Sequence, residues 1–209
     1  MRTAIVVLVI SLLTGGMVTL VSGRADAWAI PCDFLTGGGF IITRGYTVTG
    51  GAFFPIHDPA KANFGVGGSC KRGGDGHGLW GHLEYIDHGN GLNVHWTTIT
   101  GYTTSGETGT DPKTGQPTGA RIICGTARTN LYGDVDWAVG AVDKGEPGVN
   151  DEFVIRLRKF GVTVYTTEGP EDHTLGGTGP GGGNIQLHKP NPSITGDFGG
   201  TCDAAPEFF

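Results

Sequence analysis

The segment Glu152-Phe-Val-Ile-Arg-Leu-Arg158 alternates apolar and polar side chains, and after a Lys-Phe-Gly turn the segment 161–167 alternates again. The apolar side chains of the first segment fall on one face of a strand: Phe153, Ile155 and Leu157. This period of two is typical of half-buried antiparallel strands. We therefore predict a β-hairpin over 152–167.

The same alternation recurs along most of the chain. The turn His88-Gly-Asn-Gly91 contains Asn-Gly, which favours the tight turns of β-hairpins. The predicted strands are bounded by Gly, Pro, Asn or Asp and cover 40–44, 46–54, 62–66, 79–87, 92–100, 120–129, 134–142, 152–158, 161–167 and 184–188. About ten short strands without an amphipathic helix predict an all-β fold. The expected architecture is an antiparallel β-sandwich with Greek-key or jelly-roll connections. Two stretches, 103–118 and 168–183, are expected to be loops.

The composition excludes several classes of protein. The 209 residues include 40 Gly and 11 Pro without a collagen repeat, and four Trp, ten Phe and five Tyr supply material for a packed core. The formal net charge is −6, and the Lys and Arg residues are not clustered. A nucleic-acid partner and polybasic membrane attachment are therefore excluded.

The N-terminal segment has the layout of a secretory signal peptide. Arg2 precedes the apolar run 4–13, and Ala25-Asp-Ala27 and Ala27-Trp-Ala29 are both small-x-small cleavage sites. We predict a signal peptide over 1–27, with cleavage after Ala27 or Ala29 left open. An uncleaved anchor is the alternative, because the weakly apolar run 4–21 approaches the length of a membrane span. The mature protein is expected to be secreted, extracellular or at the cell surface, without a membrane span.

Four cysteines in an exported chain predict two disulfides, and three pairings are possible. We favour Cys32–Cys202 and Cys70–Cys124, which would tie a tail over 190–209 back to one domain over 28–189. Zinc held by these cysteines is disfavoured, because no two of them lie closer than 38 residues.

Several segments, in this order, resemble the post-COAP domain of secreted bacterial proteins, which often follows a choice-of-anchor module. They are Thr36-Gly-Gly-Gly-Phe-Ile41, Ala62-Asn-Phe-Gly-Val66, Trp80-Gly-His-Leu-Glu-Tyr-Ile-Asp-His88, Asn93-Val-His95, Asp143-Lys-Gly-Glu-Pro-Gly148 with Asp151, and Gly182-Gly-Asn-Ile-Gln-Leu-His188. The resemblance covers about residues 32–189 and implies an exported β-rich domain without established catalytic residues. One departure is that residues 178–181 separate Leu175-Gly-Gly177 from Gly182, where the family usually runs straight through.

Two groups of side chains are candidate metal sites. The first group consists of His82, Glu84, His88 and His95. Alternation and a two-residue turn would bring these side chains onto one surface of the sheet. Imidazoles together with a carboxylate are suitable ligands for zinc or copper. The alternative is an ordinary solvated sheet face. Oxygen ligands suited to calcium occur in a second set: Asp143, Glu146, Asn150 and Asp151. The alternative there is a tight connection built on Glu-Pro-Gly.

Trp80 and Tyr132, each beside a turn, are candidates for a carbohydrate-binding platform, whereas Trp137 and Trp96 are expected in the core. No catalytic residues are assigned, because the chain lacks a Gly-x-Ser-x-Gly elbow and an H-E-x-x-H helix. We expect a non-catalytic structural, adhesive or ligand-binding domain of the bacterial surface or extracellular matrix. A carbohydrate-binding module and a metal-dependent hydrolase or lyase are the alternatives. The expected partners are an extracellular glycan or a protein that adds a strand to a sheet edge.

Overall fold

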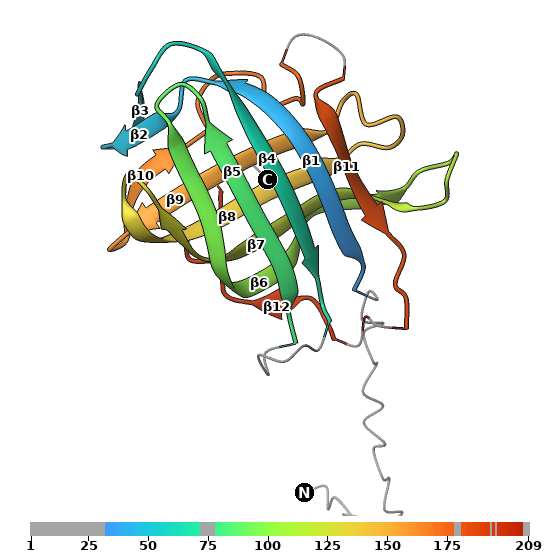
Figure 1. Ribbon diagram of the computed structural model, residues 1–209. Helices are drawn as coiled ribbons and strands as arrows, with labels where there is room; N and C mark the ends of the chain where they lie inside the picture. The colour runs from blue at the N-terminus through green and yellow to red at the C-terminus, as the bar shows by residue number, and fades with distance from the viewer. Residues whose placement is uncertain (1–31, 72–77, 178–180, 193, 195, 207–209) are drawn as a thin grey trace, which may run out of the picture.

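A computed structural model describes residues 32–71, 78–177, 181–192, 194 and 196–206. Strands and turns make up this part of the chain, and it contains no helix, so the all-β prediction is confirmed (Figure 1). No helix long and apolar enough to cross a membrane occurs among these residues. The predicted signal peptide, 1–27, lies outside them.

Twelve strands form one antiparallel sheet. In chain order they are β1 (Phe34–Thr43), β2 (Tyr46–Thr49), β3 (Ala52–Pro55), β4 (Ala60–Ser69), β5 (Trp80–Asp87), β6 (Leu92–Thr110), β7 (Pro117–Thr129), β8 (Gly133–Asp143), β9 (Glu152–Lys159), β10 (Val162–Thr166), β11 (Gly183–His188) and β12 (Gly199–Gly200). Their order in the sheet is β11-β1-β4-β5-β6-β7-β8-β9-β10-β2-β3, and β12 pairs with β6. Consecutive strands from β4 to β10 are neighbours, so the centre of the sheet is a meander.

The sheet curls into two layers because its longest strand bends. Three register shifts interrupt the pairing of β6 with β7, after Trp96, Ile99 and Ser105. Such bulges bend a strand and increase its twist. As a result β11, β1, β4 and β5 form one layer, β7 to β10 form the other, and the strands of the two layers cross (Figure 1). The predicted sandwich is therefore realised as one curled sheet.

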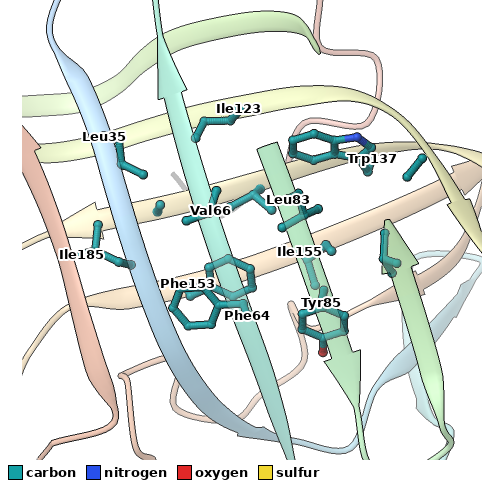
Figure 2. Close-up of a cluster of buried hydrophobic side chains, with 14 of the residues drawn as sticks. Leu35, Phe64, Val66, Leu83, Tyr85, Ile123, Trp137, Phe153, Ile155 and Ile185 are labelled. Atoms are coloured by element: carbon teal, nitrogen blue, oxygen red, sulfur yellow. The ribbon is translucent and has the colours of Figure 1, made fainter. Parts of the chain in front are cut away.

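The core lies between these layers. Phe64 of β4 stacks on Phe153 of β9 with ring centroids 3.9 Å apart, and Trp137 is fully buried (Figure 2). The apolar face predicted for 152–158 is buried throughout, at Phe153, Ile155 and Leu157. Trp96 is partly buried against the same cluster. Alternation in the sequence thus identified the inward faces correctly.

The structure corrects two of the predicted boundaries. The expected loop 103–118 is the end of the β6–β7 hairpin, with its turn at 111–116. Its strands are rich in threonine, which has a high β propensity without marking a buried face. The predicted strand 46–54 is divided at Gly50-Gly51 into β2 and β3.

The disulfides are Cys32–Cys70 and Cys124–Cys202, so the favoured pairing was wrong. Phe34 is opposite Ser69 in the β1–β4 ladder, which places Cys32 beside Cys70. The tail is tied back through Cys202 as predicted, but to Cys124 on β7. This disulfide passes over β6 at Gly101, where a Cβ atom would lie 2.6 Å from both sulfur atoms.

The described part of the tail, residues 189–192, 194 and 196–206, runs past the lower end of the sheet in Figure 1. The ring of Phe198 stacks on buried Tyr102 at 5.4 Å. Beyond Cys202, Ala204 packs on Cys124 and Ala138 on the outside of the second layer. Arg156 and Arg158, also on that outside, donate to the carbonyl oxygens of Ala205 and Asp203. We call the outward side of β7, β8 and β9 the strapped face.

Candidate ligand-binding surface

The outward side of β11, β1, β4 and β5, which we call the open face, carries mostly polar residues in rows across the strands. The ladder registers define two neighbouring rows: His188–Phe34–Ser69–Trp80 and Gln186–Thr36–Gly67–His82. The inward row between them, Leu187–Leu35–Gly68–Gly81, is buried, as alternation requires. The open face is therefore the solvated surface of the first layer.

A pocket of about 220 Å³ lies where the first of these rows meets the tail. Its walls combine three apolar side chains with polar ones: Phe34, Ile194 and Trp80; Thr36, Ser69, Lys71 and Asn191. We call it the Trp80 pocket. Ligand sites are commonly concave and apolar with a few polar groups that fix orientation. The volume is below the roughly 300–1,000 Å³ typical of drug-sized ligands, so it suits one ring-sized group.

The two aromatic walls are held by neighbouring rings. Trp80 is 43% exposed and meets His82 edge-on, with centroids 5.7 Å apart. Phe34 stacks on His188 at 4.4 Å, and His188 Nε2 is 2.9 Å from the Thr36 hydroxyl. Burial lowers the pKa of His188, which favours its neutral form at pH 7. The aromatic walls are thus positioned before any ligand arrives.

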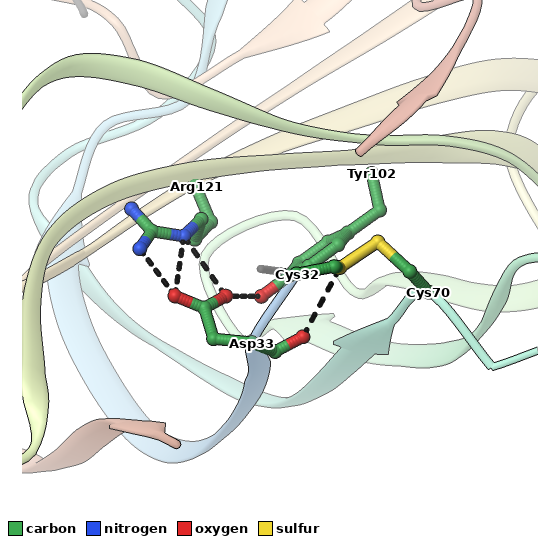
Figure 3. Close-up of a disulfide and its surroundings, with 5 residues drawn as sticks. All are labelled: Cys32, Asp33, Cys70, Tyr102 and Arg121. Carbon is green, nitrogen blue, oxygen red and sulfur yellow. Dashed lines mark hydrogen bonds and ion pairs between the residues drawn. A yellow bond between two sulfur atoms is a disulfide. The ribbon is translucent and has the colours of Figure 1, made fainter. Parts of the chain in front are cut away.

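The base of the pocket is braced by a disulfide and a buried ion pair (Figure 3). Cys70, bonded to Cys32, separates Ser69 from Lys71 in the chain. The next residue after Cys32, Asp33, accepts hydrogen bonds from Arg121 Nε at 3.1 and 3.2 Å and from the Tyr102 hydroxyl at 2.9 Å. Burial raises the pKa of Tyr102 well above its usual range, so it stays a donor to Asp33. These contacts fix the adjacent ends of β1 and β4.

The structure brings together only part of the predicted zinc or copper set. Glu84 and His95 are directly opposite and form an ion pair, as the predicted hairpin register requires. His88 instead contacts the side-chain oxygen of Asn63 at 2.9 Å, and His82 packs against Trp80. Nowhere in the described part of the chain do three His, Cys, Asp or Glu side chains lie close enough to hold a metal ion.

Most residues of the predicted calcium set accept hydrogen bonds at the edge of the sheet. Asp151 accepts the backbone N–H groups of Ile185 and Lys144, at 2.8 and 2.9 Å. Asp143 accepts the N–H of Leu187 at 2.7 Å. The outer edge of β11 is therefore covered by carboxylates that take the place of another strand. Glu146 accepts from the Asn184 amide, and Asn150 is exposed.

Burial dominates the titration of these carboxyl groups. It raises the pKa of Asp151 to about 6, and the nearby Asp143 and Glu146 act in the same direction, whereas the two backbone hydrogen bonds oppose it. The pKa of Asp143 is also raised, mainly by burial. Both carboxyl groups accept backbone N–H groups at the edge of the sheet. They form the seam between β11 and β8.

The two aromatic residues predicted to form one platform lie at opposite ends of β5. Trp80 begins that strand, and Tyr132 lies in the turn after β7, near Asp87 at the other end. Seven residue steps along a strand span about 23 Å. Tyr132 also packs against the core cluster. Of the two predicted residues, Trp80 lines the pocket and Tyr132 does not. The other lining residues Phe34, Lys71, Asn191 and Ile194 were not predicted.

The segments that carry the family resemblance lie together in space. Five of them fall on the neighbouring strands β11, β1, β4, β5 and β6, and residues 143–151 cover the edge of β11. At the departure from the family pattern, Phe40 still bonds on both sides, to Gly182 O at 2.7 Å and Gly176 N at 2.8 Å. A Cβ atom on Gly182 would lie 1.7 Å from Gly176 N, so this close approach requires glycine.

The chain matches no protein-family model, and neither a curated protein nor a solved structure matches it.

Proposed function

We propose that this chain is an exported, non-catalytic binding domain of the bacterial surface or extracellular matrix, and that its ligand is a carbohydrate held in the Trp80 pocket. The observation that carries the proposal is an exposed tryptophan facing a preset pocket beside hydroxyl, amide and ammonium groups. Sugars present both apolar C–H faces and hydroxyl groups, and aromatic walls with a few polar groups complement both.

The spacing of the walls supports a ring-shaped ligand. Phe34 and Trp80 are opposite the same residue, Ser69, on either side of β4. Two strand spacings separate their backbones by about 9.5 Å. A ring between two surfaces needs about 7–8 Å, because carbon atoms in contact lie about 3.5–4.0 Å apart.

Export and family membership are part of the same proposal. Two disulfides are typical of proteins that fold outside the cytoplasm, and the apolar run after Arg2 has the pattern of a secretory signal peptide. The grouping of the resembling segments on one half of the sheet supports a post-COAP type of domain. A glycan partner fits a surface location.

The test is calorimetric titration with a panel of oligosaccharides, comparing the wild type with Trp80→Ala. We expect the substitution to weaken binding about thirtyfold, since truncating a central tryptophan in a binding site removes about 2 kcal/mol. Phe54→Ala, which removes a 52% exposed aromatic side chain on edge strand β3, is the matched control and should bind normally. Equal binding by Trp80→Ala, or no binding of any glycan, would refute the proposal.

A further inference from the structure

We infer that the sugar bound in the Trp80 pocket carries a negative charge, as a uronic acid does, and that Lys71 receives its carboxylate. This inference rests on the proposed function and specifies its ligand. The chain has a net charge of −6, yet none of the described residues that line this pocket is an Asp or a Glu. Among these described lining residues, Lys71 alone has a side chain that is charged at pH 7.

Three lysines elsewhere in the described residues have a hydrogen-bonding or ion-pair partner within the protein. Lys144 pairs with Glu152, Lys113 donates to Glu146 O, and Lys159 donates to Tyr132 O. Across the described residues, no carboxylate pairs with Lys71. A positive charge at the edge of a pocket, without a countercharge among these residues, favours an anionic ligand.

Two contacts hold Cys70, the residue that precedes Lys71. Cys70 is bonded to Cys32, and its carbonyl oxygen accepts the N–H of Gly196 from the tail at 2.8 Å. The ammonium therefore extends from an anchored position, with three donors for a carboxylate. One lysine supplies one charge without the two-pronged geometry of arginine, which suits a singly charged group on a sugar.

The test compares tetragalacturonate with its methyl ester, which has the same rings without the charges, by calorimetric titration at low salt. We expect the wild type to bind the acid about three- to tenfold more tightly. Lys71→Gln should reduce the affinity for the acid by that factor and leave the ester unchanged. Lys61→Gln is the matched control: Lys61 is on the open face near the start of β4, about 26 Å from Ser69 at its other end, and should change neither affinity. Added salt should reduce the difference.

Each outcome separates the two proposals. Equal affinity for acid and ester, both lost in Trp80→Ala, would overturn the charge inference and leave sugar binding intact. Binding of neither compound, nor of any other glycan, would overturn both. A charge preference that survives Lys71→Gln would place the cation elsewhere and overturn the inference. Tighter Lys71-dependent binding of a sulfated galactose tetramer would confirm an anionic sugar but replace the carboxylate with sulfate.

Discussion

The two outward sides of the curled sheet differ in how they meet solvent. The strapped face has small and basic residues, Cys124, Ala138 and Arg156, in one row, and the tail covers them. The open face has aromatic, amide and imidazole side chains, and Asn191 and Ile194 of the tail meet it at the Trp80 pocket. The difference shows that the tail stabilises one side of the sheet and leaves the other available for a ligand.

The largest effect should come from releasing the tail. The variant Cys124→Ser/Cys202→Ser opens a loop of 78 residues, and the chain-entropy model gives a loss of about 4.5 kcal/mol in the free energy of unfolding. Urea unfolding measures this. Cys32→Ser/Cys70→Ser, with a separation of 38, is the control and should lose about 3.9 kcal/mol. Sugar binding that survives in the first variant and weakens in the second would match the position of the pocket.

A smaller loss is expected on removing the buried charge pair under the strap. Glu168 is fully buried and accepts from Arg156 Nη2 at 2.8 Å. Glu168→Gln leaves the largely buried guanidinium without its countercharge, so unfolding should require about 3 kcal/mol less. Thermal and urea unfolding check this value. A change below about 1 kcal/mol would mean that water reaches Arg156 under the tail.

The seam between the two halves should respond to pH. Because burial raises the pKa of Asp151 to about 6 in the folded protein, the folded state holds a proton that the unfolded chain has lost. Its contribution is present below about pH 4 and is lost as the pH rises through 6, with a slope approaching about 1.4 kcal/mol per pH unit. Urea midpoints between pH 4 and 7 measure it. Asp151→Asn should flatten this part of the profile, and an unchanged profile would contradict the assignment.

The smallest effect should be found on the open face. Glu84 and His95 form an ion pair there, but their side chains are 54% and 69% exposed. Solvent-exposed pairs contribute about 0–1 kcal/mol, so Glu84→Gln should change the free energy of unfolding by less than about 0.5 kcal/mol. Comparison with Glu168→Gln on the strapped face makes the contrast quantitative. A loss similar to that of Glu168→Gln would show that a ligand or partner had covered the open face.

Local patterns predicted most of the fold. Alternation identified the strand at 152–158 and its buried face. The segment His88-Gly-Asn-Gly91 identified a turn, which has four residues in place of the expected two and still leaves Glu84 opposite His95. The same reasoning failed at 103–118, because threonine-rich strands solvated on both sides carry no alternation. The disulfides could not be deduced, since their pairing follows from β1 lying beside β4 and from the tail crossing β6.

Only one wall of the candidate site was visible in the sequence. Trp80 could be chosen as an aromatic residue beside a turn. Phe34, Lys71 and Ile194 come from three other segments, and only the register of β1, β4 and β5 and the course of the tail place them around it. The contacts of the predicted calcium carboxylates were hidden for a related reason. The edge of β11, which takes up their oxygens, is distant in sequence.

The disulfides join cysteines that are consecutive in the chain, first with second and third with fourth. On the proposed export route the chain crosses the membrane from its N-terminus, and the cysteines emerge in the order in which they pair. An oxidase that joins each new cysteine to the preceding unpaired one would make both native bonds directly. Maturation would then need an oxidant but no disulfide isomerase, and the second bond would close only after the tail had left the translocation channel.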